Sequence, residues 1–164
     1  MKLDKRMFVT TAAGALLAFV LVGCASMRPP ATITDTAART PQLSTLSKLV
    51  ADAGLAETLR GAGPYTVFAP SDEAFKKVPA KTMAELAANK DLLRAVLTYH
   101  VVAGKVTAAE VKNGKTKTVN GAELTAARAG SFVTIEDAIV QTADMPASNG
   151  IVHIIDTVLI PPKR

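Results

Sequence analysis

The sequence is poor in the side chains that disulfides, metals and nucleic acids require: it has one cysteine, two histidines and 4% aromatic residues among 164. A single cysteine excludes a disulfide within the chain, so the core alone must hold the fold. Two histidines without a spacing such as His-x-x-x-His allow at most a sparse metal site, because zinc needs three or four protein ligands. Scattered Lys and Arg with so few aromatics exclude a nucleic-acid partner. We therefore predict no metal and no cofactor.

The first residues lack the pattern of a folded segment and of a membrane-spanning helix. Lys2, Lys5 and Arg6 precede an apolar run, residues 7–22, with no charged stop-transfer cluster after it. A spanning helix needs about 20 apolar residues, so this run is short. We predict that residues 1–23 are a bacterial signal peptide. Its removal takes away three cations and one anion, which lowers the formal net charge from +5 to +3.

The residues around the cysteine resemble the lipobox of bacterial lipoproteins. In Leu21-Val22-Gly23-Cys24, cleavage leaves Cys24 as the new N-terminus, carrying a thioether-linked diacylglycerol. The alternative is an ordinary free or buried thiol. Two or more acyl chains anchor a protein stably to a membrane without crossing it. Ala25 lacks the Asp that commonly retains lipoproteins in the inner membrane, so we expect an outer-membrane or periplasm-facing place in the cell envelope; Sec and twin-arginine export both stay open.

Residues 24–40 predict a lipidated cysteine followed by a flexible tether. The stretch is small, polar and proline-bearing, and it has no apolar period to bury. Its mean reach is about 20–25 Å, from about 5–6 Å times the square root of its length. We therefore place a single domain in residues 41–164.

The domain divides into a helical first half and a strand-rich second half. Leucines at helical spacing predict short helices within residues 43–59 and 82–97, the latter with a break at 89–91. Between them, Tyr65–Ala69 predicts a strand, followed by a helix that Ser71 caps. Helices first and strands afterwards indicate an α+β fold. The later strand-forming segments, separated by turn signals, are residues 99–102, 115–119, 122–127, 132–135, 139–143 and 151–155.

Three stretches carry the most specific pattern in the domain. They are Thr66-Val67-Phe68-Ala69-Pro70-Ser71-Asp72-Glu73-Ala74-Phe75, Tyr99-His100-Val101-Val102 and Asn149-Gly150-Ile151-Val152-His153-Ile154-Ile155-Asp156. Together they resemble a fasciclin I domain: the first and third are similar to its two hallmark segments and the second to its Tyr-His motif. Their spacing extends the resemblance over residues 41–161. It implies a single α+β domain, a β-rich wedge or sandwich flanked by several short helices.

The resemblance also implies an adhesion module, not an enzyme. Fasciclin domains are extracellular and cell-surface modules, many of them tethered by lipid. Animal relatives bind integrins and matrix proteins through the Tyr-His region and an Asp-Ile dipeptide. The matching positions here, Tyr99, His100, Asp144 and Met145, are therefore candidate binding residues, with Met145 standing where the family has Ile. The resemblance implies no catalytic residue.

His153 and Asp156 interrupt an apolar run near the C-terminus, where a catalytic pair is the alternative to a structural role. Side chains alternate along a strand, so residues three apart point to opposite faces and cannot form a dyad. A buried His needs partners for both ring nitrogens, and an Asp near a strand end can accept backbone N–H bonds. We predict structural roles for both. Ser71 lacks the flanking glycines of a nucleophile elbow, and helix capping accounts for it.

Residues 144–149 predict a polar loop between two strands, where recognition often lies, with a plain connection as the alternative. The leading hypothesis is a non-enzymatic, lipid-anchored module for adhesion, or for protein or glycan contacts, at the bacterial envelope. The alternative is a periplasmic structural or carrier lipoprotein that binds a small apolar ligand or a cell-wall component, which a ligand-sized apolar cavity would favour. Catalysis lacks a convergent nucleophile, base and oxyanion set.

Overall fold

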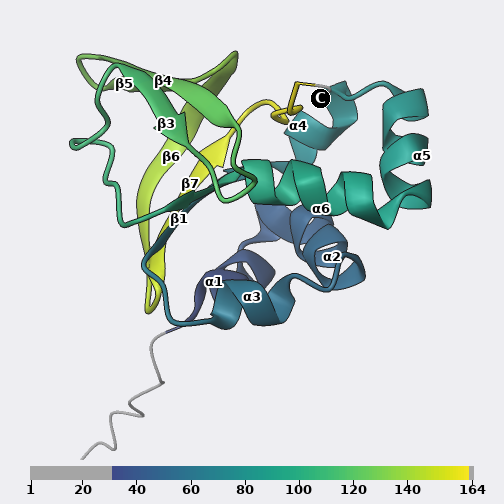
Figure 1. The fold of residues 1–164 in the computed structure, drawn as a ribbon. Helices are drawn as coiled ribbons and strands as arrows, with labels where there is room; N and C mark the ends of the chain where they lie inside the picture. The colour runs from purple at the N-terminus through teal and green to yellow at the C-terminus, as the bar shows by residue number, and fades with distance from the viewer. Residues whose placement is uncertain (1–30, 163–164) are drawn as a thin grey trace, which may run out of the picture.

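Helices dominate the chain up to residue 99 and strands dominate after it (Figure 1). The computed structural model describes residues 31–162; the predicted signal peptide and Cys24 lie outside them. The helices are α1 (Ile33–Arg39), the short 3₁₀ helix η1 (Pro41–Leu43), α2 (Ser44–Asp52), α3 (Ala56–Arg60), α4 (Asp72–Lys77), α5 (Ala80–Ala88) and α6 (Lys90–Tyr99). The strands are β1 (Tyr65–Pro70), β2 (Val101–Ala103), β3 (Gly114–Lys117), β4 (Glu123–Ala129), β5 (Phe132–Ile135), β6 (Ala138–Ala147) and β7 (Gly150–Ile155).

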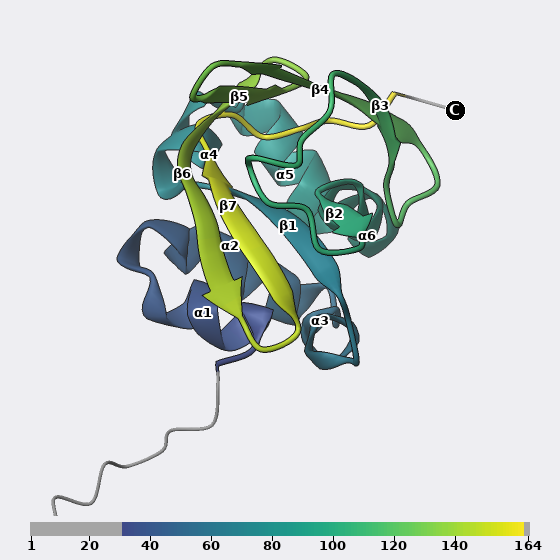
Figure 2. The ribbon, with the colours of Figure 1, turned by 90° about the vertical axis from the view of Figure 1, so that its left-hand side faces the viewer.

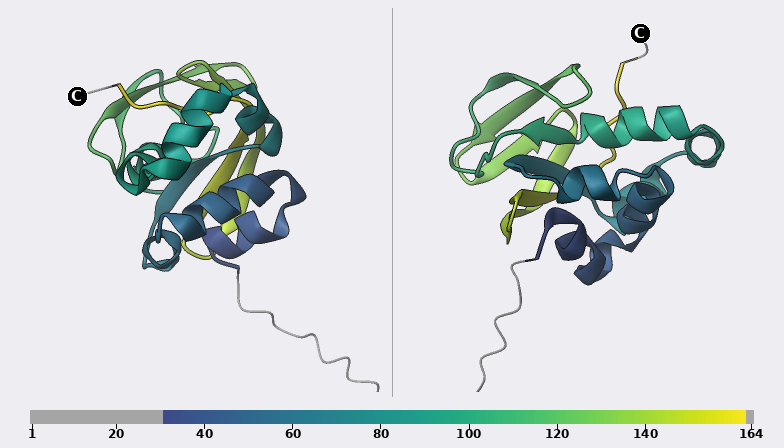
Figure 3. Two further views of the ribbon diagram at one scale, coloured as in Figure 1. Left: turned by 90° about the vertical axis from the view of Figure 1, so that its right-hand side faces the viewer. Right: turned by 60° about the horizontal axis from the view of Figure 1, so that its bottom comes forward.

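The strands form one curved sheet in the order β2-β1-β7-β6-β5-β4-β3. Only β1 and β7 run parallel, with Phe68 opposite His153. At the two edges, Val102 of β2 bridges Thr118, just beyond β3, so the sheet closes almost into a barrel. The helices pack together on one side of the strands (Figure 3, right). The predicted α+β class is therefore confirmed.

Two hydrophobic clusters lie on opposite faces of β1 and β7. Val67 and Val152 face the helical cluster, the buried residues that also include Ile33, Leu46, Val50, Leu59, Val96 and Leu97. Phe68 and Ile155 face the barrel cluster, which also includes Leu124, Ala126, Val133 and Ile135. Strands buried on both faces are continuous apolar runs without alternation, which is the pattern that β1 and β7 have in the sequence.

The predicted helix boundaries of the first half follow local capping. The Ser71 hydroxyl accepts a hydrogen bond from the Ala74 N–H (3.3 Å) at the start of α4. The Asn89 side chain accepts from the N–H groups of Asp91 and Leu92 at the start of α6. These caps satisfy backbone donors that the first turn of a helix leaves without partners. The break predicted at residues 89–91 is thereby confirmed.

The predicted tether is wrong for residues 33–39, which form α1. Thr32 and Asp35 make a capping box: the Asp35 N–H donates to the Thr32 hydroxyl, and the Thr32 N–H donates to the Asp35 carboxylate. Ile33 and Ala37 are buried in the helical cluster. A helix this short is held by packing more than by propensity, and burying a side chain such as Ile33 contributes about 1.5–3 kcal/mol. The folded domain therefore starts before residue 41.

Two strand boundaries also differ from the prediction. Tyr99 is the last residue of α6 and His100 its C-cap, so the Tyr-His pair is helical and the strand starts at Val101. Residues 144–147, predicted as a loop, belong to β6, where Met145 pairs with Val152. The register of β6 shifts before Met145, and Asp144 has a φ of 57°, a conformation that Asp tolerates better than most residues. Because of this irregularity, apolar and polar residues do not alternate along this part of β6, so its sequence does not predict a strand.

Candidate functional site

Polar side chains of the two central strands hold the segment that follows β2, residues 104–108. The hydroxyl of Thr66, on β1, donates to the Gly104 carbonyl (2.7 Å) and accepts from the Val106 N–H (2.8 Å). Thr66 is fully buried, and both bonds are partly shielded from water. Both are stronger constraints there than on a surface, because a buried polar group without a partner is costly. Thr66 thus positions this segment against β1.

His153 of β7 holds the same segment from the neighbouring strand. Its Nδ1 accepts from the Asp144 N–H (3.2 Å), so the proton is on Nε2, which donates to the Val106 carbonyl (2.9 Å). The ring stacks on Phe68, with centroids 5.5 Å apart and an angle of 21° between the planes. The side chain is 1% exposed. Both ring nitrogens therefore have backbone partners inside the fold, as a structural histidine requires.

Tyr99 and His100, two of the candidate binding residues, are buried and cannot form a contact surface. His100 Nδ1 donates to the Val96 carbonyl (2.8 Å) and Nε2 accepts from the Leu159 N–H (3.0 Å). Burial lowers the pKa of His100 to about 4, against the opposite effect of the Val96 carbonyl. The Tyr99 hydroxyl donates to the Glu123 carbonyl (3.1 Å). As binding residues these two are corrected: they join α6 to the strands and to the C-terminal segment.

The other two candidates, Asp144 and Met145, lie on β6 and differ in exposure. Asp144 is exposed, and its carboxylate accepts a hydrogen bond from the Ala108 N–H (2.8 Å). Met145 is half-buried and packs against the helical cluster. Of the four candidate binding residues, Asp144 alone therefore presents an exposed side chain. Together with Thr66 and His153 it holds both ends of the 104–108 segment.

Asn149 and Gly150 join the β6–β7 turn to the helices. The Asn149 side chain accepts from the Ile33 N–H (3.0 Å) and donates to the carbonyls of Leu59 (2.6 Å) and Gly61 (3.1 Å). A Cβ on Gly150 would overlap the Tyr65 carbonyl, so only glycine allows β1 and β7 to approach here. Figure 2 shows α1 beside this turn. This pair therefore closes the end of the molecule at which α1 lies.

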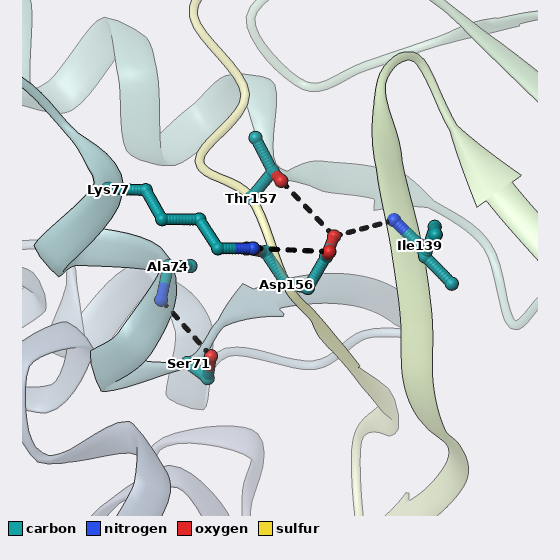
Figure 4. A network of polar contacts seen from close by, with 6 residues as sticks. All are labelled: Ser71, Ala74, Lys77, Ile139, Asp156 and Thr157. Carbon is teal, nitrogen blue, oxygen red and sulfur yellow. Dashed lines mark hydrogen bonds and ion pairs between the residues drawn. The ribbon is translucent and has the colours of Figure 1, made fainter.

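Asp156 and Ser71 serve the junction between β7, α4 and β6 (Figure 4). The Asp156 carboxylate accepts from the Ile139 N–H (2.8 Å) and pairs with the Lys77 ammonium (3.3 Å). Burial acts to raise the pKa of Asp156, but these bonds and the Thr157 hydroxyl hold it below its ordinary value. His153 and Asp156 bond to separate sets of partners. They do not form a dyad.

Asp72, next to Ser71, links α4 to the start of α2. Its carboxylate accepts from the Ser44 hydroxyl (2.7 Å) and from the Thr45 N–H (2.8 Å). Burial acts to raise the pKa of Asp72, and these hydrogen bonds outweigh it, so the pKa lies below its ordinary value. A carboxylate at a helix N-terminus is also favoured by the helix dipole. Asp72 is therefore an additional cap for α2.

Glu136, which no pattern in the sequence indicated, ties the β5–β6 turn to the barrel. Glu136 has a φ of 52°, and its carboxylate accepts from the Thr125 N–H (2.6 Å) and, at 3.4 Å, from the Tyr99 hydroxyl. Burial raises the pKa of Tyr99, and the Glu136 charge raises it further. No local pattern marks a Glu for this conformation, since Asn, Asp and Gly are the usual turn residues.

The polar side chains of the hallmark segments bond mainly to other parts of the fold. Within residues 31–162, no group of three or more His, Cys, Asp or Glu side chains could hold a metal ion. Over the same range, every buried side-chain nitrogen and oxygen has a hydrogen-bond partner. The hallmark side chains are thus engaged by the fold itself, and the predicted lipidation residue, Cys24, lies outside the described range.

Comparisons with known proteins agree with the fold. The profile of the Fasciclin domain matches residues 41–161. Protein sll1483 of Synechocystis is 45% identical over 133 residues, covering 80% of this chain and 74% of that protein. Cell surface glycolipoprotein MPB83 of Mycobacterium bovis is 39% identical over 137 residues, covering 80% and 61%. Immunogenic protein MPT70 of Mycobacterium tuberculosis is 40% identical over 131 residues, covering 77% and 67%.

A solved structure shares the architecture. The FAS1 domain pair of the insect cell adhesion molecule Fasciclin I superposes with a TM-score of 0.61 at 23% identity, covering 74% of this chain and 46% of that one. At this identity the likeness concerns the fold alone. The profile match and the bacterial relatives decide the family: the chain belongs to the fasciclin domain family.

Proposed function

We propose that this chain is a non-enzymatic, lipid-anchored module that contacts a protein or a glycan at the bacterial cell envelope. The observation that carries the proposal is its membership of the fasciclin family together with a 39% identical relative named a cell surface glycolipoprotein. The lipobox-like Leu21–Cys24 adds the anchor. Among residues 31–162, no helix has the length and apolarity needed to cross a membrane.

The position of α1 supports a defined orientation at the membrane. Thr32, which caps α1, comes eight residues after Cys24. A chain spans at most about 3.3–3.6 Å per residue, so this length holds the domain within about 30 Å of a lipid on Cys24. Strands β4 and β5 lie at the end of the molecule opposite α1 (Figures 1 and 2). That distal end is the one proposed to meet a partner.

Exposed side chains give the proposal two testable positions. Phe132, on β5 at the distal end, is 69% exposed, and Phe is among the residues enriched at the core of protein interfaces. Asp144, on the flank formed by β6, is the exposed member of the predicted binding residues. The hallmark residues Thr66 and His153 are buried and are proposed to act only through the fold.

The anchor is tested by fractionation of cells that express the whole chain. Cys24→Ala should move the protein from the detergent phase to the aqueous phase in a detergent partitioning experiment, because its acyl chains would be missing. Cys24→Ser is the closest match in size and controls for changes in export. Wild-type partitioning of both variants would contradict lipid anchoring while leaving the interaction proposal intact.

The interaction is tested by capture on immobilised protein from residue 25 to 164, which contains every described residue. Whole cells, purified cell wall and envelope polysaccharides are passed over it separately, so that a protein and a glycan partner are distinguished. Saturable capture that Phe132→Ser or Asp144→Asn reduces would support the proposal and locate the surface. Asn tolerates the left-handed backbone and can still accept from the Ala108 N–H, so Asp144→Asn removes only the charge. Capture equal to that by heat-unfolded protein would refute it.

A further inference from the structure

An apolar cavity lies between the helices and the face of β1 and β7. Its volume is ≈ 160 Å³, and it reaches the surface between α1, α2 and α3, where Ala38, Ala51 and Arg60 are exposed. Buried residues of the helical cluster form its deeper part: Ile33, Leu46, Val50, Leu59, Val67 and Val152. Protein interiors leave few voids larger than a water molecule, and the deeper part of this space lies among buried side chains.

The sequence explains why the space is left open. The three helices meet through small side chains, with Ala37 on α1, Ser47 and Ala51 on α2, and Ala56 on α3. Helix axes pack about 8–10 Å apart, a distance that larger side chains normally fill. The deeper aliphatic residues belong to the helical cluster and line the gap from the side of the sheet. The cavity is therefore a consequence of four small residues at one helix junction.

The buried polar groups at the cavity already have partners, which restricts the ligand chemistry of its deeper part. His100, at the base, bonds to the Val96 carbonyl and the Leu159 N–H. Asp35, nearer the opening, accepts hydrogen bonds from Thr32. No buried side-chain donor or acceptor within residues 31–162 is left for a polar ligand. A polar molecule placed here would lose its own hydrogen bonds to water.

Charges at the opening balance one another. Arg60 lines the cavity and forms an ion pair with Glu57 (2.9 Å). Hydrogen bonds from Thr32 lower the pKa of Asp35 first, and the positive charges of Arg60 and Arg39 lower it further. The two charged residues that line the cavity, Asp35 and Arg60, have opposite signs, which gives no net attraction for a charged head group. A dry apolar cavity of about 150 Å³ is large enough to bind benzene.

We propose that this cavity binds a small neutral apolar molecule, or the neutral hydrocarbon part of a larger one, of about the size of a benzene ring. The site goes beyond the proposed interaction function, which uses exposed side chains at the distal end and on β6. It lies instead at the end of the domain that the anchor holds nearest the membrane. A ligand in it would bridge α1 to the sheet.

The test uses methyl-labelled protein from residue 25 to 164 and two probes of equal ring size, benzene and benzoate. Benzene should shift the methyl resonances of Ile33, Leu46 and Leu59 saturably and leave those of Val133 and Ile135, in the barrel cluster, unchanged. Benzoate should bind at least about tenfold more weakly, because its carboxylate would lose its hydration among the buried apolar residues. Shifts that do not saturate, or that spread equally over both clusters, would overturn the proposal, and so would equal binding of the two probes.

Matched variants on α2 decide whether the cavity is the site. Ser47 lines the cavity, whereas its neighbour Lys48 is exposed and does not. Ser47→Leu should fill the space and weaken benzene binding at least about tenfold, and Lys48→Leu should leave it unchanged. If Ser47→Leu does not fold, Ala51→Leu replaces it, since Ala51 lies at the opening. Wild-type affinity in a folded, cavity-filled variant would overturn the proposal.

Discussion

Strands β1 and β7, which are covered on both faces, and strands β4 and β5, at the end of the molecule opposite α1 (Figure 1), use polar residues in opposite ways. The first two are called the central strands here and the second two the outer strands. In β7 every residue is buried, and in β1 all but the first. In β4 and β5 buried residues alternate with exposed or half-buried ones over much of their length. Polar side chains of the central pair, Thr66 and His153, therefore bond to backbone groups inside the fold, whereas those of the outer pair meet water.

The difference shows what the hallmark segments of this family do in this chain. A strand covered on both faces has to be apolar, and each polar exception needs a partner that the fold supplies. Thr66 and His153 both bond to Val106, which lies after β2 and far from either in sequence. Thr66 and His153 thus determine how the segment after β2 packs against β1 and β7. Exposed positions such as Phe132, where the fold places few demands, are the ones proposed to meet a partner.

The largest effect should come from closing the space between the central strands. Gly150→Ala places a Cβ into the Tyr65 carbonyl, and the paired backbones of β1 and β7 cannot separate without breaking their ladder. We expect a loss of at least about 4 kcal/mol in the free energy of unfolding, or no folded protein, since overpacking against backbone is at the severe end of single substitutions. Urea denaturation followed by circular dichroism measures it.

Gly130→Ala, in the β4–β5 turn, is the matched control. Gly130 has a φ of 62°, and nothing lies within 4 Å of an added Cβ there. The cost is then the left-handed backbone alone, about 1–2 kcal/mol. Equal losses for the two alanine variants would show that the close approach of β1 and β7 does not limit stability.

The second prediction removes one hydroxyl from each type of strand. Thr66→Val keeps the shape of the side chain but leaves the Val106 N–H and the Gly104 carbonyl without their partner. We expect a loss of about 2–3 kcal/mol and faster hydrogen exchange of the Val106 amide. Thr125→Val, at an exposed position of β4, should change stability by less than about 0.5 kcal/mol. A neutral Thr66→Val would contradict the structural role of the first hallmark segment.

The third prediction concerns pH, and it rests on the buried His100. Its folded-state pKa of about 4 lies below the ordinary value of 6.5, so folding favours the neutral ring. The stabilisation is complete above pH 6.5 and is lost as the pH falls from there toward about 4, because the unfolded chain binds the proton first. Between about pH 7 and pH 5 the loss should be about 2 kcal/mol.

Urea denaturation at the two pH values, on wild type and His100→Gln, separates this effect from the rest. The variant should be less stable at both values, since the bonds to Val96 and Leu159 change. Its stability should nevertheless depend less on pH than that of wild type, by about the same 2 kcal/mol. An unchanged pH dependence in the variant would assign the titration to other groups.

Local signals in the sequence predicted the elements that local interactions determine. Ser71 and Asn89 start helices by bonding to N–H groups three or fewer residues away, so their role follows from neighbouring residues. The α+β class followed from helices preceding strands. The hallmark segments then predicted the fasciclin family. The prediction that His153 and Asp156 do not form a dyad followed from strand alternation alone.

The features that could not be predicted depend on distant parts of the chain. α1 has a capping box, but only Ile33 and Ala37 mark its buried face, and their place in the core depends on strands that follow much later. The sheet closes through Val102 and Thr118, which no local pattern connects. The binding role expected for Tyr99 and His100 failed because burial of a helix end is decided by what packs against it. Asp144 was predicted to be exposed because it would lie in a loop. It is exposed, but it lies in β6, where the register of the strand shifts.

The smallest predicted effect compares two ion pairs, one at the end of β7 and one across β3 and β4. Lys77 and Asp156 are 3.3 Å apart, and the Asp156 side chain is 21% exposed; Lys115 and Glu123 are 3.5 Å apart, with side chains 73% and 60% exposed. Solvent screens the second pair more, so double-mutant cycles with Lys→Met and with Asp→Asn or Glu→Gln should give a coupling of about 0.5–1 kcal/mol for the first pair and less than about 0.3 kcal/mol for the second. Equal couplings would mean that the contrast between central and outer strands concerns packing and hydrogen bonds only, and does not extend to the charges at their ends.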